Sequence, residues 1–209
     1  MPSLYIITGS NGAGKSSLGP EYLPEEISEN YRVFDGDLLY TQKLSELFPK
    51  IVRSAKYARR DALDYVVKLF EELTKQALLE NDHYVYEGHF TNDETWQTPK
   101  TFKAAGYQIH MLFFGLDNPE LSGFRVTERV TDGGHYVDPK TLRDNFYGNL
   151  VKLNEYHNII DDLTIVDTSE INHKILFKRI NHQVEFFEQR EELPNWFTEY
   201  LPDILQYVP

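Results

Sequence analysis

A glycine-rich segment near the start of the chain ends in a lysine and two serines. Gly9, Gly14, Lys15 and Ser16 stand at the spacing G-x-x-x-x-G-K-S. Glycines let the main chain approach phosphate oxygens closely, a lysine at this position reaches the β- and γ-phosphates, and the serine hydroxyl ligates Mg²⁺. The segment therefore predicts ATP and Mg²⁺ as ligands. The expected nucleotide-binding residues are Gly9, Ser10, Asn11, Gly12, Ala13, Gly14, Lys15, Ser16 and Ser17.

Two aspartates follow the second predicted strand. Asp35 and Asp37 are two residues apart, so their side chains can point to the same side of an extended segment. At the carboxyl end of a parallel strand they would face the ligand. One of them is expected to hold Mg²⁺, and the other to accept the proton of an attacking hydroxyl group. The alternative is a turn with a helix cap, for which aspartate is also favoured.

Three more polar side chains are predicted to contact a substrate. Glu87 ends the third predicted strand beside Gly88, where it is expected to bind the substrate or a metal-bound water. His135 lies in a loop, and Arg143 lies one turn into the helix that follows this loop. The alternative for Glu87 is a surface charge at a strand end.

Two arginines stand on one predicted helix. Arg125 and Arg129 are four residues apart and therefore share a helix face, and Gly133-Gly134 follow them. This arrangement predicts a mobile lid whose arginines stabilise the charge on a transferring phosphoryl group. The alternative for each arginine is a solvated or ion-paired helix residue.

Alternating strands and helices must position these residues. Short apolar runs predict strands, and helical periodicity predicts the segments between them. Such alternation after a phosphate loop predicts an α/β fold of the three-layer αβα P-loop NTPase type, with a kinase-like parallel sheet of about five strands. The predicted strands are 4–7, 31–34, 83–87, 107–114 and 163–166, and the predicted helices are 15–19, 38–47, 58–81, 93–105, 119–132 and 138–157.

We expect a single domain over residues 1–209, because no linker or repeat divides the chain. Its core is predicted to span residues 1–170, and a C-terminal extension residues 171–209. Within the extension, two apolar runs predict a hairpin over 174–188. Residues 194–206 are predicted to form a final short helix.

Composition limits the classes of partner. The 21 basic and 33 acidic residues give a net charge of −12, which disfavours a nucleic-acid partner. The chain has no cysteine, so disulfides, thiolate nucleophiles and cysteine-based zinc sites are excluded. No apolar run approaches the roughly 20 residues of a membrane span. We therefore expect a cytoplasmic protein without a nucleic-acid or membrane partner.

Six segments together resemble the zeta-toxin-like P-loop kinases, in particular the short bacterial branch often labelled predicted ABC-type ATPases. The resemblance runs from about Leu4 to Ser169 and is carried by LYIITGSNGAGKSS, FDGD, YEGHFT, LDNPEL, RVTERVTDGGHYVDPKTLRDNF and VDTSE. It implies phosphorylation of a sugar hydroxyl of UDP-N-acetylglucosamine with ATP and Mg²⁺. It also implies that Asp37 is the base and that Lys15, Ser16, Arg125 and Arg129 surround the phosphates. Separately, we expect Ser16 and Asp35 to hold Mg²⁺, while the division of roles between Asp35 and Asp37 stays open.

The chain departs from this family at two adjacent positions near the predicted site, and it is also shorter than the longer toxins. Gly88-His89 stand where the short branch commonly has a threonine pair. The resemblance therefore does not determine the acceptor pocket. No LSGGQ-type signature supports the ABC label. An antitoxin partner is compatible with the resemblance but cannot be inferred from one chain.

The leading hypothesis for function is an ATP-dependent kinase with a small-molecule hydroxyl acceptor, such as a nucleotide sugar. The alternative is a P-loop ATPase with a regulatory or assembly role and no such acceptor. Against this alternative, the chain has no apolar run ending in Asp-Glu that would position a hydrolytic water. A nucleic-acid end kinase is disfavoured by the negative charge.

Overall fold

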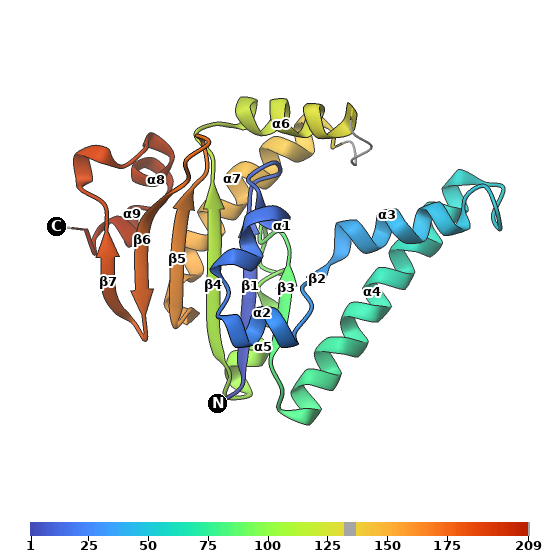
Figure 1. The fold of residues 1–209 in the computed structure, drawn as a ribbon, viewed down its shortest axis with the longest axis horizontal. Helices are drawn as coiled ribbons and strands as arrows, with labels where there is room; N and C mark the ends of the chain where they lie inside the picture. The colour runs from blue at the N-terminus through green and yellow to red at the C-terminus, as the bar shows by residue number, and fades with distance from the viewer. Residues whose placement is uncertain (132–136, 209) are drawn as a thin grey trace.

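The computed structural model describes residues 1–131 and 137–208. A seven-stranded sheet with the order β2-β3-β1-β4-β5-β6-β7 forms its centre (Figure 1). The first five strands in this order are mutually parallel, as predicted, and the last two are antiparallel. The strands are β1 (Ser3–Gly9), β2 (Phe34–Asp35), β3 (Tyr84–Glu87), β4 (Gln108–Gly115), β5 (Asp162–Asp167), β6 (Lys174–Ile180) and β7 (Gln183–Phe187).

Helices cover both faces of this sheet. Helices α1 and α2 lie in front of the central strands in Figure 1, and α5 and α7 lie behind them. Helix α7 packs an apolar stripe against the sheet, since Leu142, Phe146, Leu150 and Leu153 are all buried. The helices are α1 (Lys15–Leu18), α2 (Glu25–Asn30), α3 (Gly36–Leu47), α4 (Ala55–Glu80), α5 (Gln97–Ala104), α6 (Pro119–Thr131), α7 (Pro139–Tyr156), α8 (Asn195–Tyr200) and α9 (Pro202–Leu205).

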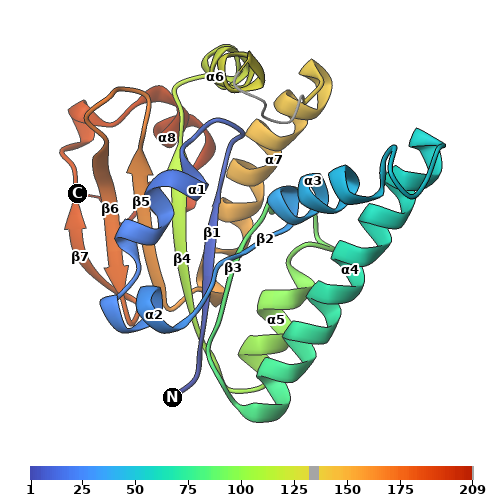
Figure 2. The same ribbon diagram turned by 45° about the vertical axis from the view of Figure 1, so that its right-hand side comes forward.

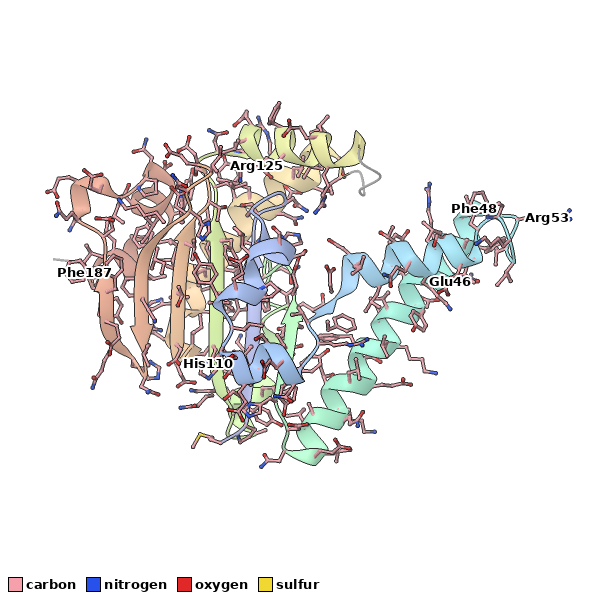
Figure 3. The ribbon with its side chains drawn as sticks, viewed as in Figure 1. Glu46, Phe48, Arg53, His110, Arg125 and Phe187 are labelled. Carbon is pink, nitrogen blue, oxygen red and sulfur yellow. The ribbon has the colours of Figure 1, made fainter. Side chains whose placement is uncertain are left out.

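Helices α3 and α4 pair with each other and form an arm that extends away from the sheet (Figures 1 and 2). The far end of the arm carries Glu46, Phe48 and Arg53 (Figure 3). In α4, Ala58 and Ala62 have no solvent exposure, so this face of the helix is packed. The near end of α3 follows directly from β2, which brings this helix next to the phosphate loop.

Three predicted boundaries are wrong in detail. Strand β2 covers only Phe34–Asp35, instead of 31–34, because only these two residues pair with β3. Helix α5 begins at Gln97 instead of residue 93, since the Asn92 side chain accepts a hydrogen bond from the Thr95 amide and holds a turn there. The final helix is two helices, α8 and α9, separated at Leu201 before Pro202, a residue that cannot continue a helix.

The predicted C-terminal hairpin is present as β6 and β7. Its turn residues Asn181 and His182 have φ values of 48° and 63°, the left-handed conformation that two-residue hairpin turns require. Strand β6 pairs with β5 in the main sheet. The sheet is therefore larger than predicted, because the hairpin joins it instead of standing apart.

Strand register gathers the ends of β1, β2 and β3 at one edge of the sheet. Asp35 pairs with Glu87, and Ile7 of β1 also pairs with Glu87. The phosphate loop leaves β1 two residues later, after Gly9. The carboxylates and the loop thus share the carboxyl edge of the sheet, where open α/β folds bind ligands.

Candidate active site

The phosphate loop winds tightly between β4 and α6 because of its glycines. A Cβ atom on Gly9, whose φ is +137°, would lie 2.1 Å from the main-chain oxygen of Phe114. Gly12 packs against α6, where a Cβ would meet the Cβ of Arg125 at 3.0 Å. Gly14 has a φ of +82° and caps the start of α1. Each of these positions therefore requires glycine.

Lys15 places a cation at the base of the loop. Its side chain is only 7% exposed, and its Nζ donates to the main-chain oxygens of Gly9 at 3.2 Å and Ser10 at 3.0 Å. Burial lowers the pKa of Lys15, while the charges of Glu87 and Asp37 raise it. The lysine is thus held by loop carbonyls and nearby carboxylates, in reach of an anion that enters the loop.

The hydroxyl of Ser16 lies between two carboxylates. Its Oγ donates to Oε2 of Glu87 at 2.8 Å and lies 3.4 Å from Oδ2 of Asp35. The other oxygen of Asp35 caps α3 by accepting from the Leu38 amide at 2.9 Å. Burial raises the pKa of Glu87, the charge of Lys15 lowers it, and the charge of Asp35 raises it.

These three oxygen-bearing side chains fit Mg²⁺, which prefers hard oxygen ligands. Within residues 1–131 and 137–208, no group of three or more histidine, aspartate or glutamate side chains could hold a metal ion by itself. A magnesium ion beside Ser16 would therefore complete its coordination with phosphate oxygens and water, as is usual for this ion.

Asp37 and Arg129 face the same cleft from opposite sides. The cleft has a volume of about 310 Å³, and Asp37 reaches it from the first turn of α3, whereas Arg129 reaches it from α6. In the described part of the chain, the Asp37 carboxylate has no hydrogen-bond partner. The residues that line the cleft are Asn11, Gly12, Lys15, Ser16, Asp35, Asp37, Leu38, Thr41, Glu87 and Arg129.

Arg125 does not line this cleft, although the sequence predicted that it would face the phosphates together with Arg129. It lies between α6 and the ends of the central strands (Figure 3), where its guanidinium donates to the main-chain oxygens of Thr168 at 2.7 Å and Ser169 at 2.9 Å. A longer contact of 3.5 Å reaches the Gly12 oxygen. Arg125 therefore connects α6 to the segment after β5 and to the phosphate loop.

Of the two remaining predicted substrate contacts, the structure describes only Arg143, which does not line the cleft. Arg143 donates to Oε1 of Glu120 at 3.0 Å, and both side chains are exposed. This ion pair joins α7 to α6 at the surface, outside the residues that line the cleft. His135 lies outside the described residues, as do the glycines of the predicted lid hinge.

With this geometry established, comparison with known families identifies the chain. The model of the family described as zeta toxin matches residues 1–182, most of the chain. The chain belongs to the zeta toxin family. An uncharacterized protein of Haemophilus influenzae is 27% identical over 129 residues, which are 62% of this chain and 81% of that protein.

Solved structures show the same fold at low sequence identity. A chain of the PezAT chromosomal toxin-antitoxin system of Streptococcus pneumoniae matches 98% of this zeta toxin family member and 78% of its own length, with a TM-score of 0.61 and 19% identity. The AvrRxo1-ORF1:AvrRxo1-ORF2 structure with sulphate ions matches 96% of this chain with a TM-score of 0.71 and 13% identity. This chain spans 64% of that one. The fold is thus that of the kinase-like P-loop NTPases.

The family pattern did not predict a second set of polar residues next to the loop. His89, Asn145 and Asn149 contact one another and the loop residue Asn11. Two asparagines four residues apart on a helix otherwise rich in apolar positions are the signal that the sequence offered. Their partner after β3 could not be identified without the fold.

No helix in residues 1–131 or 137–208 is long and apolar enough to cross a membrane.

Proposed function

We propose that this member of the zeta toxin family is a kinase that transfers the γ-phosphate of ATP to a hydroxyl group of a small molecule. One observation carries the proposal. The Asp37 carboxylate has no hydrogen-bond partner within the described structure, and it lines the same cleft as Lys15, Ser16 and Arg129. A related structure contains AvrRxo1-ORF1:-ORF2 with ATP, which supports ATP as the phosphate donor.

Each side chain of the cleft has a proposed role. Lys15 and the loop amides bind the β- and γ-phosphates, and Arg129 balances the charge that spreads over the transferring group. Ser16 and Asp35 hold Mg²⁺, with Glu87 binding either a metal-bound water or the acceptor. When bound there, Mg²⁺ would neutralise the negative charge that develops on the phosphates.

The proposed reaction uses Asp37 as the base. The hydroxyl oxygen of the acceptor forms a bond to the γ-phosphorus while the bond between this phosphorus and the ADP oxygen breaks. The hydroxyl proton passes to the Asp37 carboxylate. This carboxylate can accept the proton because no protein donor in the described structure forms a hydrogen bond with it. ADP leaves with the electron pair of the broken bond.

The proposed acceptor is a nucleotide sugar. The resemblance to zeta-toxin-like proteins suggests UDP-N-acetylglucosamine or a related nucleotide sugar. Leu38 and Thr41 of α3 form the cleft wall beside Asp37. Gly88-His89 stand in the sequence where the short branch commonly has a threonine pair, so we propose that the acceptor pocket differs from that of the short branch. By analogy with PezAT, a toxin-antitoxin system, an antitoxin protein is proposed as a partner.

The test is ATP turnover with and without candidate acceptors, drawn from nucleotide sugars, nucleosides and aminoglycosides. A kinase releases ADP rapidly only with its acceptor, and mass spectrometry detects one phosphate on that acceptor. Equal turnover with and without every acceptor would contradict the proposal and favour the ATPase alternative. Lys15→Ala is the control for a contaminating enzyme, because any turnover that it retains does not come from this site.

A further inference from the structure

Four polar side chains from three parts of the chain meet beside the phosphate loop. Asn11 of the loop lies with its Nδ2 3.3 Å from Nε2 of His89, which follows β3. The other ring nitrogen of His89 lies 3.2 Å from Nδ2 of Asn149 on α7. Asn149 donates to the main-chain oxygen of Asn145 at 2.6 Å, and the Asn145 side chain donates to Oδ1 of Asn11 at 2.9 Å. These contacts close a ring of Asn11, His89, Asn149 and Asn145, here called the amide ring.

Asn149 anchors the amide ring to the sheet. This side chain is 1% exposed, and its Oδ1 accepts from the Phe90 amide at 2.6 Å and from Oγ1 of Thr8 at 3.3 Å. Its Nδ2 also lies 3.5 Å from the Gly9 oxygen. The position of His89 is therefore set by β1, by the segment after β3 and by α7 together.

A neutral His89 fits these partners better than a charged one, because its one unprotonated ring nitrogen can accept a hydrogen bond from one of the two asparagine amides. Both ring nitrogens face the amide nitrogen of an asparagine, and an imidazolium ion has no lone pair with which to accept from either one. Burial lowers the pKa of His89 well below its ordinary value, the charge of Lys15 lowers it further, and the Gly9 oxygen opposes this.

We propose that His89 is a positioning residue for the phosphate loop: through the amide ring it holds Asn11 in place before a nucleotide binds. Asn11 lines the cleft, and its main-chain oxygen accepts from Oγ of Ser122 at 2.6 Å. The loop is thus held from α6 through its main chain and from His89 and α7 through its side chain. A loop that is already ordered loses less conformational entropy on binding. This inference rests on the proposed nucleotide site.

Two conservative substitutions separate the two contacts of His89. The amide of glutamine reaches about the position of Nε2, so His89→Gln keeps the contact with Asn11. The amide of asparagine reaches only about the position of Nδ1, so His89→Asn keeps the contact with Asn149 and loses Asn11. His89→Ala loses both contacts. His173→Gln, a change at an exposed histidine away from the loop, is the matched control.

The first measurement is hydrogen exchange of residues 9–14 without nucleotide, which does not depend on the proposed function. We expect faster exchange in His89→Ala and His89→Asn, and exchange like that of wild type in His89→Gln and the control. Thermal unfolding of each variant verifies that it is folded at the temperature of the measurement.

The second measurement is the affinity for MgADP by calorimetry. Loss of one hydrogen bond to the loop weakens binding by about fivefold, so we expect this loss in His89→Ala and His89→Asn, and wild-type affinity in His89→Gln. Unchanged exchange and affinity in all three variants overturn the role of His89 and leave the proposed function standing. Equal weakening in all three also overturns it, because the contact with Asn11 is then not the cause. If wild type does not bind MgADP, the proposed function itself fails.

Discussion

Replacing Asp37 by asparagine separates the proposed base from the proposed nucleotide-binding residues, because the substitution keeps the size of the side chain and removes its charge. The Asp37 carboxylate has no hydrogen-bond partner within the described residues, so we expect stability to change by less than about 0.5 kcal/mol. This carboxylate lines the same cleft as Lys15, where burial lowers the pKa of that lysine and the charge of Asp37 opposes this lowering. Removing this negative charge favours an incoming triphosphate, so the affinity for MgATP should stay the same or rise.

Phosphoryl transfer, in contrast, should fall strongly in Asp37→Asn. A general base contributes about 10²- to 10⁴-fold to a rate, or roughly 3 to 5 kcal/mol of barrier. The loss should appear in single-turnover transfer, measured with saturating MgATP and acceptor, while calorimetry with an ATP analogue reports the affinity. The two measurements together assign the effect to chemistry instead of binding.

Asp35→Asn is the matched control for this prediction. Asparagine caps helices about as well as aspartate, so the cap that Asp35 provides for α3 is kept and only the charge beside Ser16 is lost. We expect a transfer defect that higher Mg²⁺ partly restores. Near wild-type transfer in Asp37→Asn would refute the reasoning and make Asp35, then Glu87, the next candidates for the base. Failure of Asp37→Asn to bind MgATP would instead move Asp37 to the metal site.

Three further predictions follow from the same contacts. Lys15→Ala should abolish MgATP binding by calorimetry, because the loop amides alone do not neutralise the phosphates; retained binding would contradict the proposed site. Arg125→Ala should lower the free energy of unfolding in urea by about 2 to 3 kcal/mol, since buried carbonyls lose a charged donor, whereas Arg143→Ala, in an exposed ion pair, should cost less than about 1 kcal/mol. His89 binds a proton more readily in the unfolded chain, so stability should decrease as pH falls below about 6.5, by at most about 1.4 kcal/mol per pH unit for this one group. His89→Gln should remove that part of the slope, and an unchanged slope would show that His89 is not held neutral.

The residues that follow strand ends could be placed from the sequence. Asp35 and Glu87 were predicted at the carboxyl ends of parallel strands, and the strand register pairs them with each other. Ser16 follows the loop that leaves β1, so it reaches the same edge. Local patterns suffice here because a parallel sheet places the ends of its strands on one side, whatever the details of packing.

The contacts of side chains on helices could not be placed in this way. Helical spacing correctly predicted that Arg125 and Arg129 share α6, but it does not fix how the helix is rotated and seated over the loop. Gly12 allows α6 to approach so closely that a Cβ there would lie 3.0 Å from the Cβ of Arg125. At this distance the Arg125 side chain is directed into the main-chain oxygens after β5, and only Arg129, one turn further along, reaches the cleft.

The same close approach explains why Arg125 still bears on the proposed reaction. Its guanidinium holds the segment after β5, and Oγ1 of Thr168 in that segment donates to the Ala13 oxygen in the phosphate loop at 3.0 Å. Asn11 is held on the other side of the loop by the amide ring. The loop is thus fixed by contacts distant in sequence, none of which the glycine and lysine spacing encodes. Arg125, predicted to bind phosphate directly, thus contacts the main chain that we propose to bind it.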